Sequence, residues 1–262
     1  MKLHARTGAG WGLAVALACL SSTPSFSQVA ATAKSPGGPG SLAGLWIITG
    51  YKGSSGYTSR DRALHTSDGK MPPLLPGPAR VLEQRIAAGD KGDPFPSTLS
   101  RCLPAGVPQM MFGAPYPVQI IELPGQVVML FEEQNHFRSI RLNAKHAVDP
   151  DPSYYGDQVG HWEGNTFVVD TIGLSDNTTL DPVGMTHSED LHVIERYRRL
   201  DATTLQIKVT IEDPKTFSRP WEATGIYKAT PPGSTIKEYI CENNRNGPDT
   251  SGHMSFGSSG EH

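Results

Sequence analysis

The sequence is poor in charge and in cysteine, and both shortages narrow its possible functions. Of its 262 residues, 19% are Asp, Glu, Lys or Arg, and the formal net charge is −3. Because no basic tract is present, we expect no nucleic-acid partner. The chain has three cysteines and no Cys-x-x-Cys pair, so it lacks an established cysteine motif for metal binding.

Signatures of common catalytic sites are also missing. The chain has no Gly-x-Ser-x-Gly, and residues 53–56, Gly-Ser-Ser-Gly, lack that spacing. The motif of the serine hydrolases is therefore absent. The chain also has no His-Glu-x-x-His and no glycine-rich loop between a strand and a helix, so the sequence predicts neither a zinc protease nor a nucleotide cofactor. We expect a function that needs no cofactor.

The chain has one long apolar run, and it lies near the first residue. Residues 11–20 are apolar, Lys2 and Arg6 precede them, and small and polar residues follow. This run is shorter than the roughly 20 residues of a membrane-spanning helix, and no later run is long enough either. The pattern is typical of a signal peptide cleaved near Ser27, which predicts a periplasmic or secreted protein. Lipid attachment at Cys19 is the alternative, and the residues before it fit it poorly.

The composition predicts one folded domain between a flexible N-terminal leader and a disordered C-terminal tail. Residues 28–43 are rich in Ala, Ser, Gly and Pro and predict a flexible leader, and residues 247–262 predict a disordered tail. Residues 44–246 then form a single domain, in which Cys102 and Cys241 are expected to form a disulfide in an oxidising compartment. Two buried free thiols are the alternative.

Alternation of apolar and polar residues predicts an all-β domain. In residues 205–211, Leu, Ile, Val and Ile alternate with polar residues, which indicates a sheet with one buried side. Hairpin turns are predicted at Pro124-Gly125, at Gly164-Asn165 and at 201–204, and further strands at 221–229 and 235–243.

One helix is predicted within a long irregular segment, residues 50–117, that is rich in Gly and Pro. Its sequence is GPARVLEQRIAAGD, with Pro78 at the first helical position and Val81, Leu82 and Ile86 on one face. Because the segment is so long, we expect it to fold over one end or face of the sheet.

Two resemblances refine the prediction. Gly44-Leu45-Trp46 resembles the Gly-x-Trp that opens the first strand of lipocalin-like barrels, although the second lipocalin motif, Thr-Asp-Tyr, is absent. This likeness implies an antiparallel meander closed into a barrel with an internal cavity, and a flattened sandwich is the alternative. The stretches GHWEGNTFVVDTIG, HSEDLHVIERYRRLDATTLQIKVTIEDP and RPW resemble a large group of exported, mostly uncharacterised bacterial proteins, over residues 100–245. That group supplies no catalytic residues to carry over.

The charged stretch MTHSEDLHVIERYRR, residues 185–199, poses the main question about a site. It reads as a strand, and its register with residues 204–213 decides which side chains face inward. One register turns His192 and two arginines inward, and a slip by one residue turns Val193, Glu195 and Tyr197 inward. We predict the second register, because it buries more apolar surface. Glu195 must then be protonated, or paired with an interior arginine such as Arg138 or Arg219.

The candidate site is drawn from polar residues expected around a barrel cavity. The candidate catalytic residues are His136, His187, Glu189, His192 and Glu195. The candidate substrate-binding residues are Tyr155, Arg138, Asp176 and His161. A two-residue turn at Gly164-Asn165 makes His161 a diagonal neighbour of Asp170, and an exposed pair on the solvent side is the alternative.

These residues allow two functions. The first is an exported isomerase, lyase or hydratase that uses acid/base groups on a small polar or aromatic molecule. The second is a lipocalin-like protein that binds a small ligand without transforming it. A metal held by His187, Glu189 and His192 is an alternative, although their spacing matches no established motif.

Overall fold

A computed structural model describes residues 40–52 and 56–241 of the chain. None of the helices in these ranges is long and apolar enough to cross a bilayer. The predictions that lie outside them are the signal peptide (1–27), most of the leader (28–43) and the tail (247–262).

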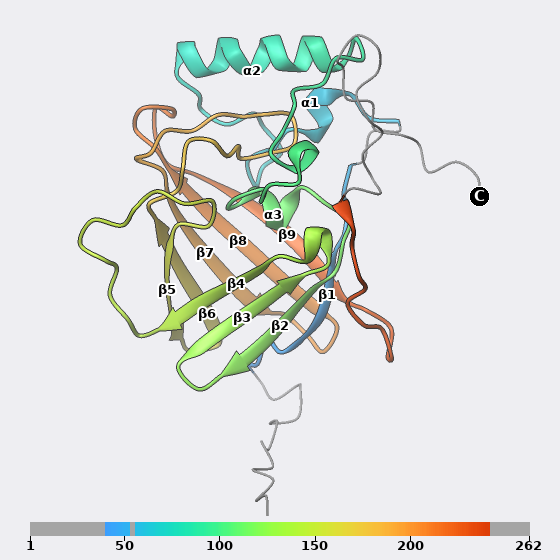
Figure 1. Cartoon of the computed structure of the whole chain (residues 1–262), viewed down its shortest axis with the longest axis vertical. Helices are drawn as coiled ribbons and strands as arrows, with labels where there is room; N and C mark the ends of the chain where they lie inside the picture. Colours follow the sequence, from blue (N-terminus) through green and yellow to red (C-terminus); the bar gives the residue numbers. More distant parts are fainter. Residues whose placement is uncertain (1–39, 53–55, 242–262) are drawn as a thin grey trace, which may run out of the picture. The chain divides into compact units, whose positions relative to one another are not determined.

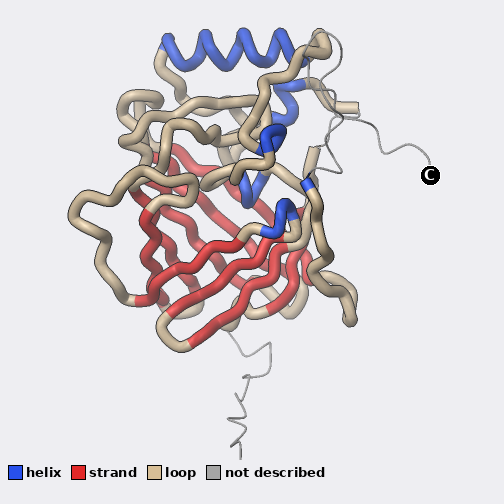
Figure 2. The backbone as a smooth tube through the Cα atoms, viewed as in Figure 1, coloured by secondary structure: helices blue, strands red, loops and turns tan. Residues whose placement is uncertain are grey.

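Nine strands close into a barrel (Figures 1 and 2). Each strand pairs with the next one along the chain, and the last returns to pair with the first. The expected lipocalin-like barrel is confirmed, and the flattened sandwich does not form. The strands are β1 (Gly44–Ile48), β2 (Val118–Leu123), β3 (Gln126–Phe131), β4 (Phe137–Leu142), β5 (Asp157–Glu163), β6 (Thr166–Ile172), β7 (His192–Arg199), β8 (Thr204–Glu212) and β9 (Trp221–Ala229).

Local turn chemistry places the hairpins where the sequence predicts them. β2 and β3 are joined through Pro124-Gly125 and β5 and β6 through Gly164-Asn165, so that Leu123 pairs with Gln126 and Glu163 with Thr166. Gly125 and Gly164 adopt φ of 80° and 58°, a conformation that glycine reaches without strain.

One junction departs from the antiparallel meander. β4 and β5 pair in parallel, through Arg141 with Val159 and Leu142 with Gly160. Two parallel neighbours need a connection that returns the chain to the other end of the sheet, and the polar segment 143–156 makes that return. The expectation that every neighbouring pair is antiparallel was wrong here.

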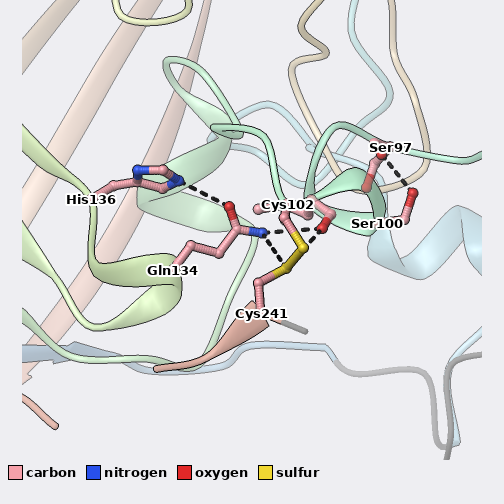
Figure 3. The surroundings of a disulfide bond; sticks show 7 residues. Ser97, Ser100, Cys102, Gln134, His136 and Cys241 are labelled. Carbon is pink, nitrogen blue, oxygen red and sulfur yellow. Dashed lines mark hydrogen bonds between the residues drawn. A yellow bond between two sulfur atoms is a disulfide. The ribbon is translucent and has the colours of Figure 1, made fainter. Parts of the chain in front are cut away.

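The strand predicted at 235–243 does not form in its described part, which ends at Cys241. β9 already pairs with β8 on one side and β1 on the other, so the closed barrel offers no free edge to a further strand. Cys241 instead forms the predicted disulfide with Cys102, beside the 3₁₀ turn η1 (Leu99–Arg101) (Figure 3).

The segment between β1 and β2 covers one end of the barrel, called the covered end below (Figure 1). Its long helix, α2 (Pro76–Gly89), begins before the predicted Pro78, because Pro76 takes the first helical position. Leu82 and Ile86, four residues apart, are buried as predicted, but Val81 is 36% exposed and does not share their face. The shorter elements are α1 (Ser59–Arg62), α3 (Gln109–Phe112) and, between β3 and β4, η2 (Glu133–Asn135).

The end of the predicted leader is part of the packed structure. Leu42 is fully buried, and its N–H donates to Glu122 Oε1 at 2.6 Å. Trp46 is 1% exposed in the barrel core and donates its ring N–H to the Leu42 carbonyl at 2.8 Å. Ordered contacts therefore begin before Gly44, where the sequence placed the start of the domain.

Candidate functional site

The register of β7 is the second of the two considered from sequence. Tyr197 pairs with Ile207 and Val193 with Ile211, and the side chain of Glu195 lies between them on the inner face. Val193, Glu195 and Tyr197 are all fully buried. Because alternate residues of a strand face opposite sides, His192, Ile194, Arg196 and Arg198 point to the outside of the barrel.

Inside the barrel, Glu195 forms a fully satisfied ion pair with Arg138 of β4. The Arg138 Nη1 and Nη2 atoms donate to the two Glu195 oxygens at 3.0 and 2.5 Å, and the Tyr197 hydroxyl donates to Oε1 at 2.7 Å. Arg138 Nε donates to Gln158 Oε1 at 2.9 Å. This is the structural alternative proposed from sequence, a buried Glu neutralised by an interior arginine.

Charge pairing and burial act together on this interior network. Burial disfavours the Arg138 cation, but the Glu195 carboxylate outweighs it and raises the pKa of Arg138. Burial, and then the Glu195 charge, raises the pKa of Tyr197 well above its usual value. Both groups therefore keep one protonation state at ordinary pH. A group that does not change its protonation state is poorly suited to general acid or base catalysis.

The residues His187, Glu189 and His192 do not converge. His187 is buried, with Nε2 2.7 Å from Thr178 Oγ1 and Nδ1 2.8 Å from the Ser188 carbonyl oxygen, and burial lowers its pKa. Glu189 is exposed, and His192 lies on the outer face of β7. No group of three metal-ligating side chains occurs in the described ranges. These three residues do not form the shared metal site considered from sequence.

The outer wall of the barrel carries a chain of imidazoles and carboxylates. Asp170 Oδ1 lies 2.8 Å from His192 Nε2 and 3.1 Å from His146 Nε2. His161 does not join them; its Nε2 lies 3.1 Å from Glu163 Oε1. The strand register does make His161 a diagonal neighbour of Asp170, on the solvent side. The two side chains do not pair, because nearer carboxylates and imidazoles satisfy both residues. All of these side chains are partly or largely exposed.

Of the remaining candidates, His136 and Tyr155 lie at the covered end, whereas Asp176 is exposed. His136 Nε2 is 2.9 Å from Gln134 Oε1, and Gln134 in turn contacts the disulfide (Figure 3). Burial lowers the pKa of His136. The His136 ring packs edge-on against Tyr155 with 6.1 Å between ring centres. The Tyr155 hydroxyl is buried and has no hydrogen-bond partner among the described residues.

Glu133, on η2, is the acid that sequence reasoning missed. It is partly buried, its carboxyl has no hydrogen-bond partner in the part of the chain that the structure describes, and burial raises its pKa to about 7. Burial also raises the pKa of three surrounding tyrosines, and the Glu133 charge adds to that rise. The tyrosines are Tyr51, Tyr116 and Tyr155.

A comparison with the neighbouring Glu132 shows why the sequence did not single out Glu133 as a site residue. Glu132 and Glu133 follow the same apolar strand and read as one polar turn. In the structure Glu132 Oε2 accepts the N–H of Lys237 at 3.0 Å, whereas Glu133 is directed toward the tyrosines. The distinction depends on the segment after β9, which lies far away in sequence.

A cavity of about 350 Å³ opens at the covered end. It lies between the α1 segment, the end of β1 and β9, and we call it the α1–β9 cavity. Apolar side chains and potential hydrogen-bonding groups share its wall. Its lining includes residues 48–52, 61–67, 69, 112, 181–182 and 224–226.

Comparisons with known proteins add little beyond the fold. No protein-family model and no curated protein matches the chain. Among solved structures, it is similar to a secretary abundant heat soluble (SAHS) protein from Ramazzottius varieornatus, with 11% identity, coverage of 74% of this chain and 98% of that one, and a TM-score of 0.34. It is also similar to the wild-type fluorescent protein UnaG, with 10% identity, coverage of 72% and 97%, and a TM-score of 0.33. At these values neither likeness bears on function.

Proposed function

We propose that this protein is a lipocalin-like barrel that binds a small molecule without transforming it. The observation that carries the proposal is the α1–β9 cavity, whose volume of about 350 Å³ lies within the range of small-ligand sites. Ile48, Phe112 and Ile226 supply apolar wall, and Tyr51 and Arg62 supply hydrogen-bonding groups.

The packing inside the barrel favours a binding site at the end of the barrel rather than at its centre. Trp46, Phe167 and Tyr197 are among the largest side chains there, and none is more than 1% exposed. The Arg138–Glu195 pair occupies the polar part of the interior. A ligand that entered the centre would have to displace these groups, at the cost of an unpaired buried charge.

The expected location agrees with the disulfide. A Cys102–Cys241 bond is stable in an oxidising compartment, and we propose that the protein acts in the periplasm or after secretion, like the exported group that its motifs resemble.

Acid/base catalysis is the second candidate function, and Glu133 is the observation that favours it. A carboxyl with a pKa of about 7, close to a tyrosine hydroxyl without a partner, suits proton transfer near neutral pH. Turnover of a metabolite that Glu133→Gln abolishes, without loss of ligand affinity, would favour this function over binding alone.

The binding proposal is tested by blocking the cavity. Thr224 lines it from the outer face of β9 and is exposed, so Thr224→Trp fills space without disturbing the core. Thr210, on the neighbouring strand β8, does not line the cavity, and Thr210→Trp is the matched control. The readout is fluorescence titration with the neutral probe N-phenyl-1-naphthylamine. We expect Thr224→Trp to weaken binding by about tenfold or more and the control to leave it unchanged. Equal affinities in the two variants would end the proposal.

A further inference from the structure

Resting on the proposed function, we propose that the α1–β9 cavity takes an organic anion. The ligand would be an apolar or aromatic molecule that bears a carboxylate, sulfonate or phosphate, and Arg62 would hold the anionic group. The unpartnered guanidinium of Arg62 indicates this chemical class of ligand.

Arg62, the last residue of α1, lines the cavity and has no partner of its own. Its guanidinium makes no hydrogen bond or ion pair with any described residue, and its Nε atom is buried. A buried N–H without an acceptor is costly, and native structures rarely leave one unpaired. An acceptor supplied by a ligand would remove that cost.

The environment of Arg62 sets it apart from other arginines. Four more lack a side-chain partner in the described structure, but all four are exposed, so water can solvate their guanidinium groups. They are Arg80, Arg101, Arg198 and Arg219. The buried Arg138 has Glu195. Arg62 therefore combines partial burial with an unused hydrogen-bonding fork, which matches the geometry of carboxylate, sulfonate and phosphate groups.

The two carboxylates that line the cavity are committed elsewhere. Asp61 Oδ2 accepts the N–H of Thr58 at 3.0 Å and its hydroxyl at 2.7 Å. Asp181 is 2% exposed and accepts four backbone N–H groups, among them those of Leu64 at 2.9 Å and Gly184 at 2.9 Å. Neither acid is hydrogen-bonded to Arg62, so neither occupies the position that a ligand anion would take.

The rest of the wall suits the body of such a ligand. Ile48, Phe112 and Ile226 offer apolar surface, and the partly buried Tyr51 offers a hydroxyl on the same lining. Burial raises the pKa of Tyr51, so its hydroxyl stays protonated and can donate to the anion beside Arg62. The cavity lining thus combines the partly buried Arg62 cation and the exposed Lys52 with neutral hydroxyl groups and apolar walls.

The test compares two fluorescent probes that differ in charge. 8-Anilinonaphthalene-1-sulfonate carries a sulfonate on the ring system of the neutral N-phenyl-1-naphthylamine. We expect the wild type to bind the sulfonate about tenfold more tightly or better, as a charge-assisted contact predicts. Arg62→Gln should remove this preference and leave affinity for the neutral probe within about twofold. Arg62→Lys should keep part of it, because the positive charge remains.

Arg60 supplies the matched control. It lies in the same helix and is exposed, with Glu83 as its partner, and Arg60→Gln should change neither affinity. Arg62→Met gives a second readout if Arg62→Gln is poorly folded, and near-ultraviolet circular dichroism checks each variant. Sulfonate affinity that survives in folded Arg62→Gln or Arg62→Met overturns the inference. In that case, if Thr224→Trp still blocks binding of the neutral probe, the proposed function is retained. Failure of both probes to bind the wild type would end both proposals.

Discussion

The barrel interior and its covered end contain similar ionisable residues in opposite states. In the interior, Arg138 and Glu195 meet in a buried pair with every oxygen accepting a hydrogen bond. At the covered end, Arg62 and Glu133 are partly buried and neither has a hydrogen-bond partner among the described residues. A satisfied pair fixes structure, whereas an unsatisfied group retains capacity for a ligand. This difference supports our proposal that the interior network stabilises the barrel and that a ligand binds at the covered end.

Breaking the interior pair should have the largest effect on stability. Glu195→Gln leaves the Arg138 charge buried without its counter-ion, and we expect the free energy of unfolding to fall by about 3–5 kcal/mol. Denaturant unfolding measures the loss. The control is Arg60→Gln, which removes an ion pair between side chains that are 46% and 54% exposed and should cost less than about 1 kcal/mol. Similar losses in the two variants would show that the interior pair is not a structural element.

Removing the disulfide should have the second-largest effect on stability, and mainly at the covered end. Cys241→Ser with Cys102→Ser frees the η1 turn from the segment after β9, and a native disulfide of this kind contributes about 2–4 kcal/mol. Hydrogen exchange separates the two regions. Amides around η1 and η2 should exchange faster, and amides of β7 and β8 should change least. Uniform loss of protection across the barrel would contradict the separation of the two regions.

Glu133 should give a smaller effect that depends on pH. Its pKa of about 7 in the folded protein lies above the ordinary value of 4.5 for a glutamate, so the folded state binds a proton more tightly than the unfolded state does. The carboxylate therefore costs stability as pH rises from about 4.5 to about 7, and the cost is complete above that. Glu133→Gln should be more stable than the wild type by about 1–3 kcal/mol at pH 8 and nearly equal to it at pH 4.5.

The matched control for this prediction is Glu132→Gln, one residue away. Glu132 accepts the Lys237 N–H on the surface, and its replacement should give no gain in stability at pH 8. Thermal unfolding of the three proteins across this pH range provides the comparison. A Glu133→Gln variant that is less stable than the wild type at pH 8 would show that Glu133 has a favourable partner as a carboxylate.

The sequence predicted the barrel wall well because the wall is governed by local rules. Strict alternation in 205–211 and the turn residues at Gly164-Asn165 are enough to set the pleat and the hairpins. The inward position of Glu195 followed from burying Val193 and Tyr197 rather than His192 and two arginines. The disulfide followed from the expected compartment and the number of cysteines.

The covered end could not be predicted in the same way, because its residues meet only through long-range contacts. Arg62 and Tyr51 come from an irregular segment without periodicity, and Glu133 follows a strand more than sixty positions later. Nothing local distinguished Glu133 from Glu132. His161 is a different case, because its partner Glu163 lies two residues along the same strand, whereas Asp170 contacts His146 and His192.

One measurement tests the contrast between the two regions most directly. It is the affinity for 8-anilinonaphthalene-1-sulfonate of Arg62→Gln and of Glu195→Gln, both measured under conditions in which near-ultraviolet circular dichroism shows them folded. We predict that Arg62→Gln binds the sulfonate about tenfold more weakly than the wild type or worse, and that Glu195→Gln stays within about twofold of it. Loss of affinity in Glu195→Gln with full affinity in Arg62→Gln would place the ligand inside the barrel and contradict the account.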